Sequence, residues 1–373
     1  MSLVKRRFDE LKLTISCEKS QVISPDDDTW ELLNSSSQVE MSLQQVSLYK
    51  YLGTWTYDSM FKTGVVKQQQ CVKTAIKYKG SCIYVSKMGP DVVDVILCTW
   101  LNVAIPAILN GCDMIPFCDS RIDEIERIQS QVAKYALGLS KTSPNICAQT
   151  ELGMKTFRQQ LYERQLKFYF RILHLPKGRW VHQALLEHLS GSWASPYLLY
   201  ISALRSRLGI FTAPSTPRVW KQLVSAFFLG STNTAVAGLE WIRPLKTFAR
   251  QPYVSENDLT TVISEFRLGC EGLGNKQPRQ GRPRKPLCPV CPTQVVNSGM
   301  HLLFVCSSLS RLRAVTGIAT FMTACMLAGI SQEETYALYV NGLTFDKNSV
   351  SFSSYLERGK CMRDMREQWL LKW

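Results

Sequence analysis

Apolar and polar positions near the start of the chain follow the two-residue period of β-strands. The period runs from Leu11 to Ile15, and a second apolar and aromatic run extends from Val46 to Leu52. Side chains alternate between the two faces of a strand, so this pattern is typical of half-buried strands. We therefore expect residues 1–57 to form a small strand-bearing unit.

From about residue 64 the period changes to that of an α-helix. One face of the expected helix carries the β-branched residues Val65, Val72, Ile76 and Ile83. The other faces present four lysines, Lys67, Lys73, Lys77 and Lys79. This arrangement predicts a basic amphipathic helix that turns its apolar face to the core and its lysines to solvent.

Three further helices are expected. A mostly apolar helix runs from just after Pro90 to about Leu109. The next opens at Ser120, where Asp123 completes a capping box, and its inward positions are Ile122, Ile125, Ile128, Val132, Tyr135 and Leu139. The third covers residues 156–173, with apolar side chains at helical spacing and basic side chains outside.

The second half of the chain gives a weaker pattern. Residues 176–275 are predicted to be helical, but five prolines interrupt them and leave the helix boundaries open. Residues 275–286 are rich in Pro, Gly, Arg and Lys and contain no acid, which predicts an exposed basic linker.

The net charge of the chain indicates the kind of partner that it binds. The chain carries 44 Lys and Arg against 30 Asp and Glu, a formal net charge of +14. This charge concentrates polyanions around the protein and makes nucleic acid the leading partner, although it also serves solubility through self-repulsion. With 45% hydrophobic residues, the chain has ample apolar material for a core, which excludes a disordered protein.

Cysteine usage and the first residues bear on the compartment. The 13 cysteines are scattered and the chain begins with charged residues, so neither a disulfide framework nor a signal or transit peptide is predicted. Two apolar stretches, 92–109 and 314–330, are shorter than the roughly 20 residues that cross a bilayer. We therefore expect an intracellular protein of nucleus and cytoplasm, without a membrane span.

Four residues give the strongest chemical signal: Cys288, Cys291, His301 and Cys306, in the spacing Cys-x2-Cys-x9-His-x4-Cys. Two cysteines two residues apart can hold one ion from a tight turn, and the other two ligands flank a short apolar run. Three thiolates and one imidazole favour zinc in a closed structural site. Accidental spacing in a cysteine-rich chain is the alternative.

Several segments resemble the reverse transcriptases of non-LTR (LINE-type) retrotransposons. Residues 11–23, with Lys19 and Ser20 before an apolar strand, look like the palm segment that follows the catalytic aspartates. Tyr49-Lys-Tyr-Leu-Gly53 looks like the strand pair that leads into the thumb, and residues 121–153 are similar to the helices after it. The order of these segments ahead of the zinc pattern makes the likeness specific.

The resemblance implies an α+β fold with five parts: 1–57, the end of the palm; 58–153, a helical thumb; 154–275, a helical linker region; 276–312, a basic linker and CCHC zinc knuckle; and 313–373, a carboxy-terminal helical segment. It also implies that the aspartates that hold Mg²⁺ in the full-length polymerase lie amino-terminal to Met1. Asp26, Asp27 and Asp28 do not replace them, because they lie in a loop without flanking strands. No catalytic residue is therefore expected in this chain.

The expected function is binding of RNA and DNA by the carboxy-terminal part of an RNA-directed DNA polymerase, with no small-molecule substrate. Phosphate contacts are expected from Lys67, Lys73, Lys77 and Lys79, and guidance toward the knuckle from Arg279, Arg282, Arg284 and Lys285. A solvated helix face is the alternative for each lysine. A second hypothesis is a non-catalytic, zinc-stabilised helical module that binds protein partners.

Overall fold

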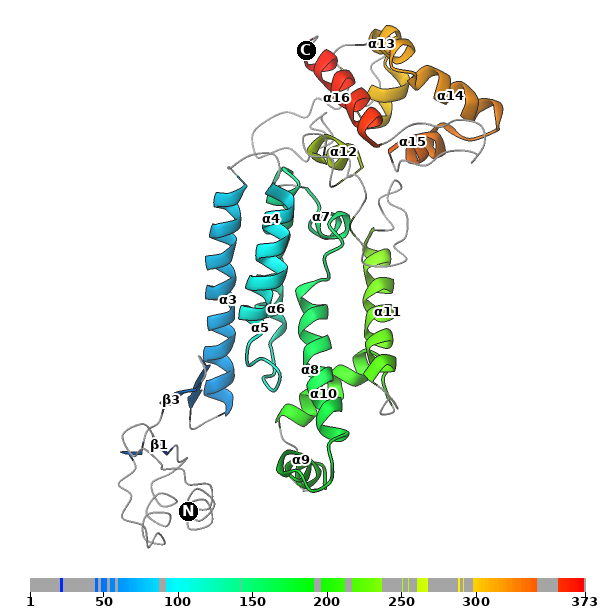
Figure 1. Cartoon of the computed structure of the whole chain (residues 1–373). Coiled ribbons are helices and arrows are strands. Elements are labelled where there is room, and N and C mark those ends of the chain that lie inside the picture. Colours follow the sequence, from blue (N-terminus) through cyan, green and yellow to red (C-terminus); the bar gives the residue numbers. More distant parts are fainter. Residues whose placement is uncertain are drawn as a thin grey trace, which may run out of the picture.

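The structure is a computed structural model of the whole chain. The residues that it describes are 21–22, 44–45, 48–51, 54–57, 60–86, 92–141, 143–190, 196–211, 217–236, 250, 254, 260–267, 288, 291, 298–340 and 355–371. These residues are mainly helical, and the helices form a long bundle with a smaller helical unit at one end (Figure 1).

Four short strands precede the bundle. β1 (Gln21–Val22) pairs in parallel with β2 (Gln44–Gln45), and β3 (Leu48–Tyr51) pairs antiparallel with β4 (Thr54–Tyr57). β3 confirms the strand predicted around residues 46–52, whereas the strand predicted from Leu11 lies outside the described residues. Within the described residues these strands form two separate two-stranded ladders, so the structure establishes the helical class and does not show the predicted palm.

The bundle is built from helices that run along a common direction in Figure 1, with two shorter helices across one end. The long members and their connections are α3 (Met60–Val85), α4 (Val92–Cys98), α5 (Ile105–Leu109), α6 (Asp119–Ala136), α7 (Asn145–Glu151), α8 (Phe157–Leu173) and α11 (Pro217–Val236). The helices at the end are α9 (Trp180–Ser190) and α10 (Pro196–Arg207). Pro196 and Pro217 each open a helix, because the first helical position needs no backbone N–H.

The buried face of α3 includes only part of the predicted face, since Val72 is buried as predicted. Val65 and Ile76 are 40% and 49% exposed, whereas Gln68, Cys71 and Ala75 are buried toward α6 and α5. Small residues at this seam let neighbouring helices approach closely, and the polar Gln68 is satisfied because its amide donates to the Pro116 carbonyl at 3.0 Å.

Lys67 is a second correction on α3. Its side chain is only 5% exposed, so it lies inside the bundle and is not presented to solvent as predicted. A hydrogen bond with Cys112, aided by the positive charge of Lys67, holds the pKa of the Cys71 thiol below its ordinary value despite burial. Lys67 is therefore a core residue.

The apolar stretch after α3 is helical throughout, as predicted. A π-helical segment, η2 (Thr99–Ala104), joins α4 to α5, and it precedes Pro106, which cannot donate a helix hydrogen bond. Residues 92–109 have a mean hydropathy of 2.1 and are the one described stretch long and apolar enough to cross a bilayer; 44% of them are buried in the bundle. Trp100, Ile96 and Ile108 are fully buried core residues.

The start of α6 corrects the predicted capping box. The helix begins at Asp119, Cys118 is its N-cap, and no side chain caps it. Gln68 fixes the chain before the helix, since its Oε1 accepts from the Cys118 backbone N–H at 3.2 Å. Asp123 instead pairs with Arg158 of α8 at 2.6 Å, so it joins two helices and does not cap one.

The start of α8 follows the prediction. Thr156 is the N-cap, and its hydroxyl oxygen accepts from the Gln159 backbone N–H at 3.1 Å. The half-buried Glu126 carboxylate of α6 accepts from the first two backbone N–H groups of the helix, those of Phe157 at 2.7 Å and Arg158 at 3.3 Å. Burial raises the pKa of Glu126 above its ordinary value.

The smaller unit beyond the bundle is also helical. It comprises α12 (Thr260–Arg267), η5 (His301–Val305), η6 (Ser307–Leu309), α13 (Ser310–Val315), α14 (Ile318–Leu327), α15 (Gln332–Val340) and α16 (Tyr355–Leu371). Two contacts join this unit to the bundle through α12.

The first contact is a buried ion pair. The Arg267 guanidinium donates two hydrogen bonds to Glu151 Oε1 and one to Oε2, at 3.1–3.2 Å, and a fourth bond at 3.4 Å to the Val340 carbonyl. The side chains of Arg267 and Glu151 are only 5% and 2% exposed. The pair therefore connects α7 of the bundle with α12 and α15 of the smaller unit.

The second contact is a close approach at Gly138, just after α6. Gly138 has a φ of +65°, and a Cβ placed on it would lie 2.4 Å from the Thr261 hydroxyl of α12. Glycine is required here both by the left-handed backbone and by the lack of space.

We expect Arg267→Ala to lower the free energy of unfolding by about 3–5 kcal/mol, because Glu151 would keep a buried carboxylate without its cation. Urea unfolding followed by circular dichroism measures this change. Arg311→Ala removes an exposed arginine from α13 of the same unit and should change stability by no more than about 0.5 kcal/mol. Equal stability of the two variants would contradict the role of the ion pair.

Candidate metal centre

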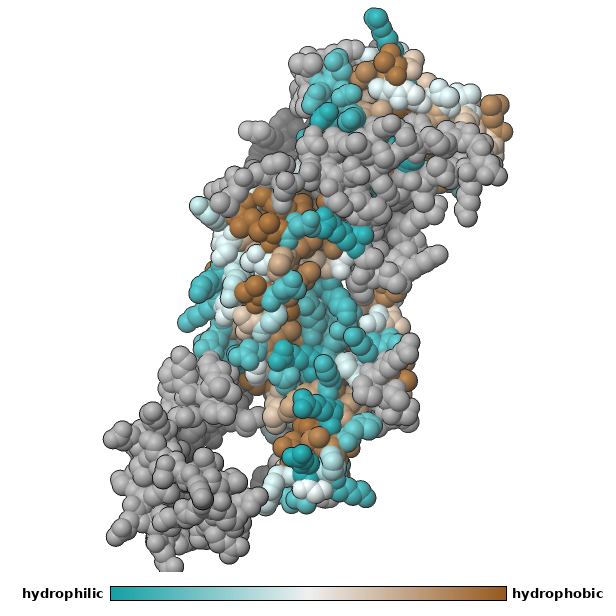
Figure 2. All heavy atoms as spheres, in the orientation of Figure 1, coloured by the Kyte–Doolittle hydropathy of each residue, from teal (hydrophilic) through white to brown (hydrophobic). Residues whose placement is uncertain are grey.

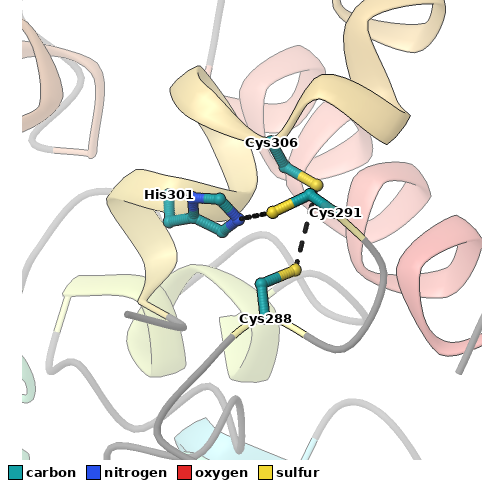
Figure 3. A group of neighbouring side chains, drawn as sticks. All are labelled: Cys288, Cys291, His301 and Cys306. Carbon is teal, nitrogen blue, oxygen red and sulfur yellow. Dashed lines mark hydrogen bonds between the residues drawn. The ribbon is translucent and has the colours of Figure 1, made fainter. Parts of the chain in front are cut away.

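The four predicted ligands come from two short segments that meet in the smaller unit (Figure 3). Cys288 and Cys291 lie two residues apart before the helical part, His301 opens the π-helical turn η5, and Cys306 directly follows this turn. The Cys306 backbone N–H donates to the His301 carbonyl at 2.7 Å, which closes the turn and brings both side chains to one side.

The ligand atoms are close enough to share one ion. All four lie within 4.8 Å of one another. The Cys291 Sγ to His301 Nε2 distance is 3.4 Å, and the Cys288 Sγ to Cys306 Sγ distance is 4.0 Å. Zinc–sulfur bonds of about 2.3 Å at tetrahedral angles place two sulfurs about 3.8 Å apart, which agrees with this spacing.

Burial disfavours the charged forms of the cluster's side chains in the absence of a cation. All four residues are buried. Burial, together with the neighbouring Cys288 thiol, raises the pKa of Cys306 to about 11, and burial, aided by the charge of Arg313, lowers the pKa of His301. The imidazole is thus neutral, the form that binds metal, and a divalent ion would displace protons from the thiols.

The donor set fits a structural zinc ion. Three sulfurs and one imidazole nitrogen complete a tetrahedron and leave no position for a reacting water. Within the described residues, this is the one group of three or more Cys, His, Asp or Glu side chains that could hold a metal. A metal ion held by all four ligands would therefore stabilise structure.

The turn that carries His301 and Cys306 belongs to the core of the smaller unit. Leu302 and Leu303 are fully buried, and the ring of Phe304 makes edge contacts with Tyr336 and Tyr339 of α15, at centroid distances of 5.8 and 5.9 Å. Metal binding and packing of the carboxy-terminal helices are thereby coupled.

Sequence reasoning missed two residues that position the ligands. Ser298 precedes His301 by three residues, and its hydroxyl oxygen accepts from the His301 backbone N–H at 3.1 Å. This is the N-cap spacing, so Ser298 could have been found from the pattern. Arg313 lies on α13 and acts on the pKa of His301 through space, which no local pattern indicates.

The structure describes four of the eight residues predicted to contact nucleic acid. Lys73 and Lys77 are exposed on α3, and Lys79 is half-buried and donates to Gln131 Oε1 at 3.1 Å. Lys67 is buried, so it does not reach a phosphate group at the surface as predicted. The other predicted contacts lie outside the described residues: Arg279, Arg282, Arg284 and Lys285.

Comparison with protein-family models, with curated proteins and with solved structures finds no match to this chain. Function is therefore argued from the metal centre and the charged surfaces.

We expect the purified protein to contain one zinc ion per chain, measured by atomic emission. Cys306→Ser should abolish stoichiometric zinc, whereas Cys98→Ser, at an exposed cysteine of α4, should leave it unchanged. Chelation should lower the midpoint of thermal unfolding of the parent by roughly 5–10 °C and leave Cys306→Ser unaffected. Retention of zinc by Cys306→Ser would contradict the assignment.

Proposed function

We propose that this protein binds RNA and DNA as the carboxy-terminal part of a non-LTR retrotransposon reverse transcriptase. The convergence of Cys288, Cys291, His301 and Cys306 carries the proposal, since it brings all four residues of the zinc-knuckle spacing within reach of one ion. The net charge of +14 supports a polyanionic partner.

In this proposal the bundle is the thumb and the region after it. Lys73 and Lys77 lie one helical turn apart on the exposed side of α3, where both can reach phosphates of one strand. The strands before α3 would be the end of the palm. Mg²⁺ would be needed only by the catalytic part of the full-length polymerase.

We expect Lys73→Gln, Lys77→Gln to weaken binding to single-stranded RNA and DNA by about 25-fold at roughly 0.1 M salt. Loss of two phosphate contacts lowers the slope of log affinity against log salt by about 1.4 for single strands. Fluorescence anisotropy across a salt series measures both quantities.

The matched control for this variant is Lys177→Gln, Lys360→Gln. It removes two exposed lysines elsewhere, after α8 and on α16, so the net charge is the same. Equal weakening by both double variants would assign binding to overall charge and not to α3. Absence of any binding by the parent at low salt would sink the proposed function.

A second candidate is a zinc-stabilised module that binds protein partners. Large apolar side chains are exposed at the end of the bundle formed by α9 and α10, where Figure 2 shows apolar atoms at the surface. Trp180 and Phe211 are 86% and 77% exposed. An apolar interface would change little with salt, in contrast to phosphate binding, so the same salt series separates the two functions.

A further inference from the structure

A groove lies between α8 and α11, which pack side by side in the bundle (Figure 1). Its volume is ≈ 520 Å³. Apolar residues contribute to its lining, Leu109 from the end of α5 and Trp220 from α11. Trp220 is almost fully buried and stacks on Phe170 at a centroid distance of 6.3 Å, which makes this wall rigid.

Four basic side chains also line this groove: Lys155, Arg164, Lys167 and Lys221. Glu163 is the one acidic residue among the lining side chains. The four cations come from three places, the residues before α8, α8 itself and α11, so the helix packing brings them together.

Two of the cations are already neutralised. Lys155 Nζ pairs with Glu163 at 2.7 Å, and Arg164 Nε pairs with Asp113 at 2.9 Å. Glu163 also accepts from the Gln159 side-chain amide at 2.8 Å, so its charge is held in place. The charges of Lys155 and Arg164 are therefore used in ion pairs within the bundle.

Lys167 and Lys221 remain uncompensated. Both are exposed, and neither forms an ion pair or hydrogen bond with another residue that the structure describes. Lys167 lies on α8 and Lys221 lies on α11, and both line the groove. One ligand in the groove could therefore contact both positive charges.

We propose that this basic groove binds the phosphodiester backbone of a single strand of RNA or DNA through Lys167 and Lys221. This inference rests on the proposed function and adds a second contact region, distinct from α3 and from the metal centre. Lysine binds phosphate as a point charge, and such contacts position a strand without reading its sequence. Trp220 is too buried to stack on a base, so the groove does not select among bases.

Lys167→Gln, Lys221→Gln tests the groove in the whole 373-residue chain, purified in the presence of zinc. Both side chains are exposed and free of internal bonds among the described residues, so the fold should survive, as thermal unfolding can verify. Binding of labelled single-stranded RNA and of single-stranded DNA should weaken about 25-fold at roughly 0.1 M salt, with a salt slope smaller by about 1.4. Lys177→Gln, Lys360→Gln should retain more of the parent's affinity.

The outcomes separate the groove from the proposed function. If the parent binds and the groove variant matches the control variant, the groove is overturned while nucleic-acid binding stands. If the parent does not bind, both fail. A groove variant that loses binding to polyglutamate but keeps its affinity for nucleic acid would also overturn the assignment.

A crosslinking measurement provides a second readout. Gln160 lines the groove between the charged residues, and p-benzoylphenylalanine placed there should crosslink to a labelled strand on illumination. The same group at Lys177, outside the groove, should crosslink far less. Equal crosslinking at both positions would contradict a strand in the groove.

Discussion

The buried ion pair between Glu151 and Arg267 joins the helical bundle to the smaller unit, which carries the candidate metal centre. Taking both charges out of water is costly, and the pair is tolerable because the guanidinium donates to both carboxylate oxygens and to the Val340 carbonyl. These bonds require α7, α12 and the end of α15 to meet in one arrangement. Gly138 supports the same arrangement, since only a residue without a side chain admits Thr261 so closely.

The metal centre imposes a second constraint on the same unit. His301 and Cys306 are fixed by a single π-helical turn, whose apolar side chains fill the core against α15 and α16. Apart from α16, the helices of this unit have ten residues or fewer. A metal that holds two segments together therefore contributes stability that such a small core supplies only in part.

The charged side chains of the bundle are of two kinds: some form ion pairs within the fold, and others are exposed to solvent without a partner among the described residues. Arg158 pairs with Asp119 and Asp123 and so joins α8 to α6, and Arg164 pairs with Asp113 and joins α8 to the connection between α5 and α6. Lys73, Lys77, Lys167 and Lys221 have no such partner among the described residues. A net positive charge is thus concentrated in side chains that are available to a polyanion.

The sequence alone determined the local features. Helical periodicity identified α3 and α8, and the spacing of three cysteines and a histidine identified the side chains that converge as candidate metal ligands. Each of these depends on residues a few positions apart, or on a ligand chemistry that few residue types provide.

Tertiary structure decided which side of each helix is buried and which distant charges meet. Periodicity favoured the β-branched face of α3. Packing buries Val72 of that face, leaves Val65 and Ile76 exposed, and also encloses the polar Gln68 and Lys67. Glu151 and Arg267 are 116 residues apart, and the groove cations lie on separate helices. No local pattern encodes such contacts, because they arise only when helices distant in sequence pack against one another.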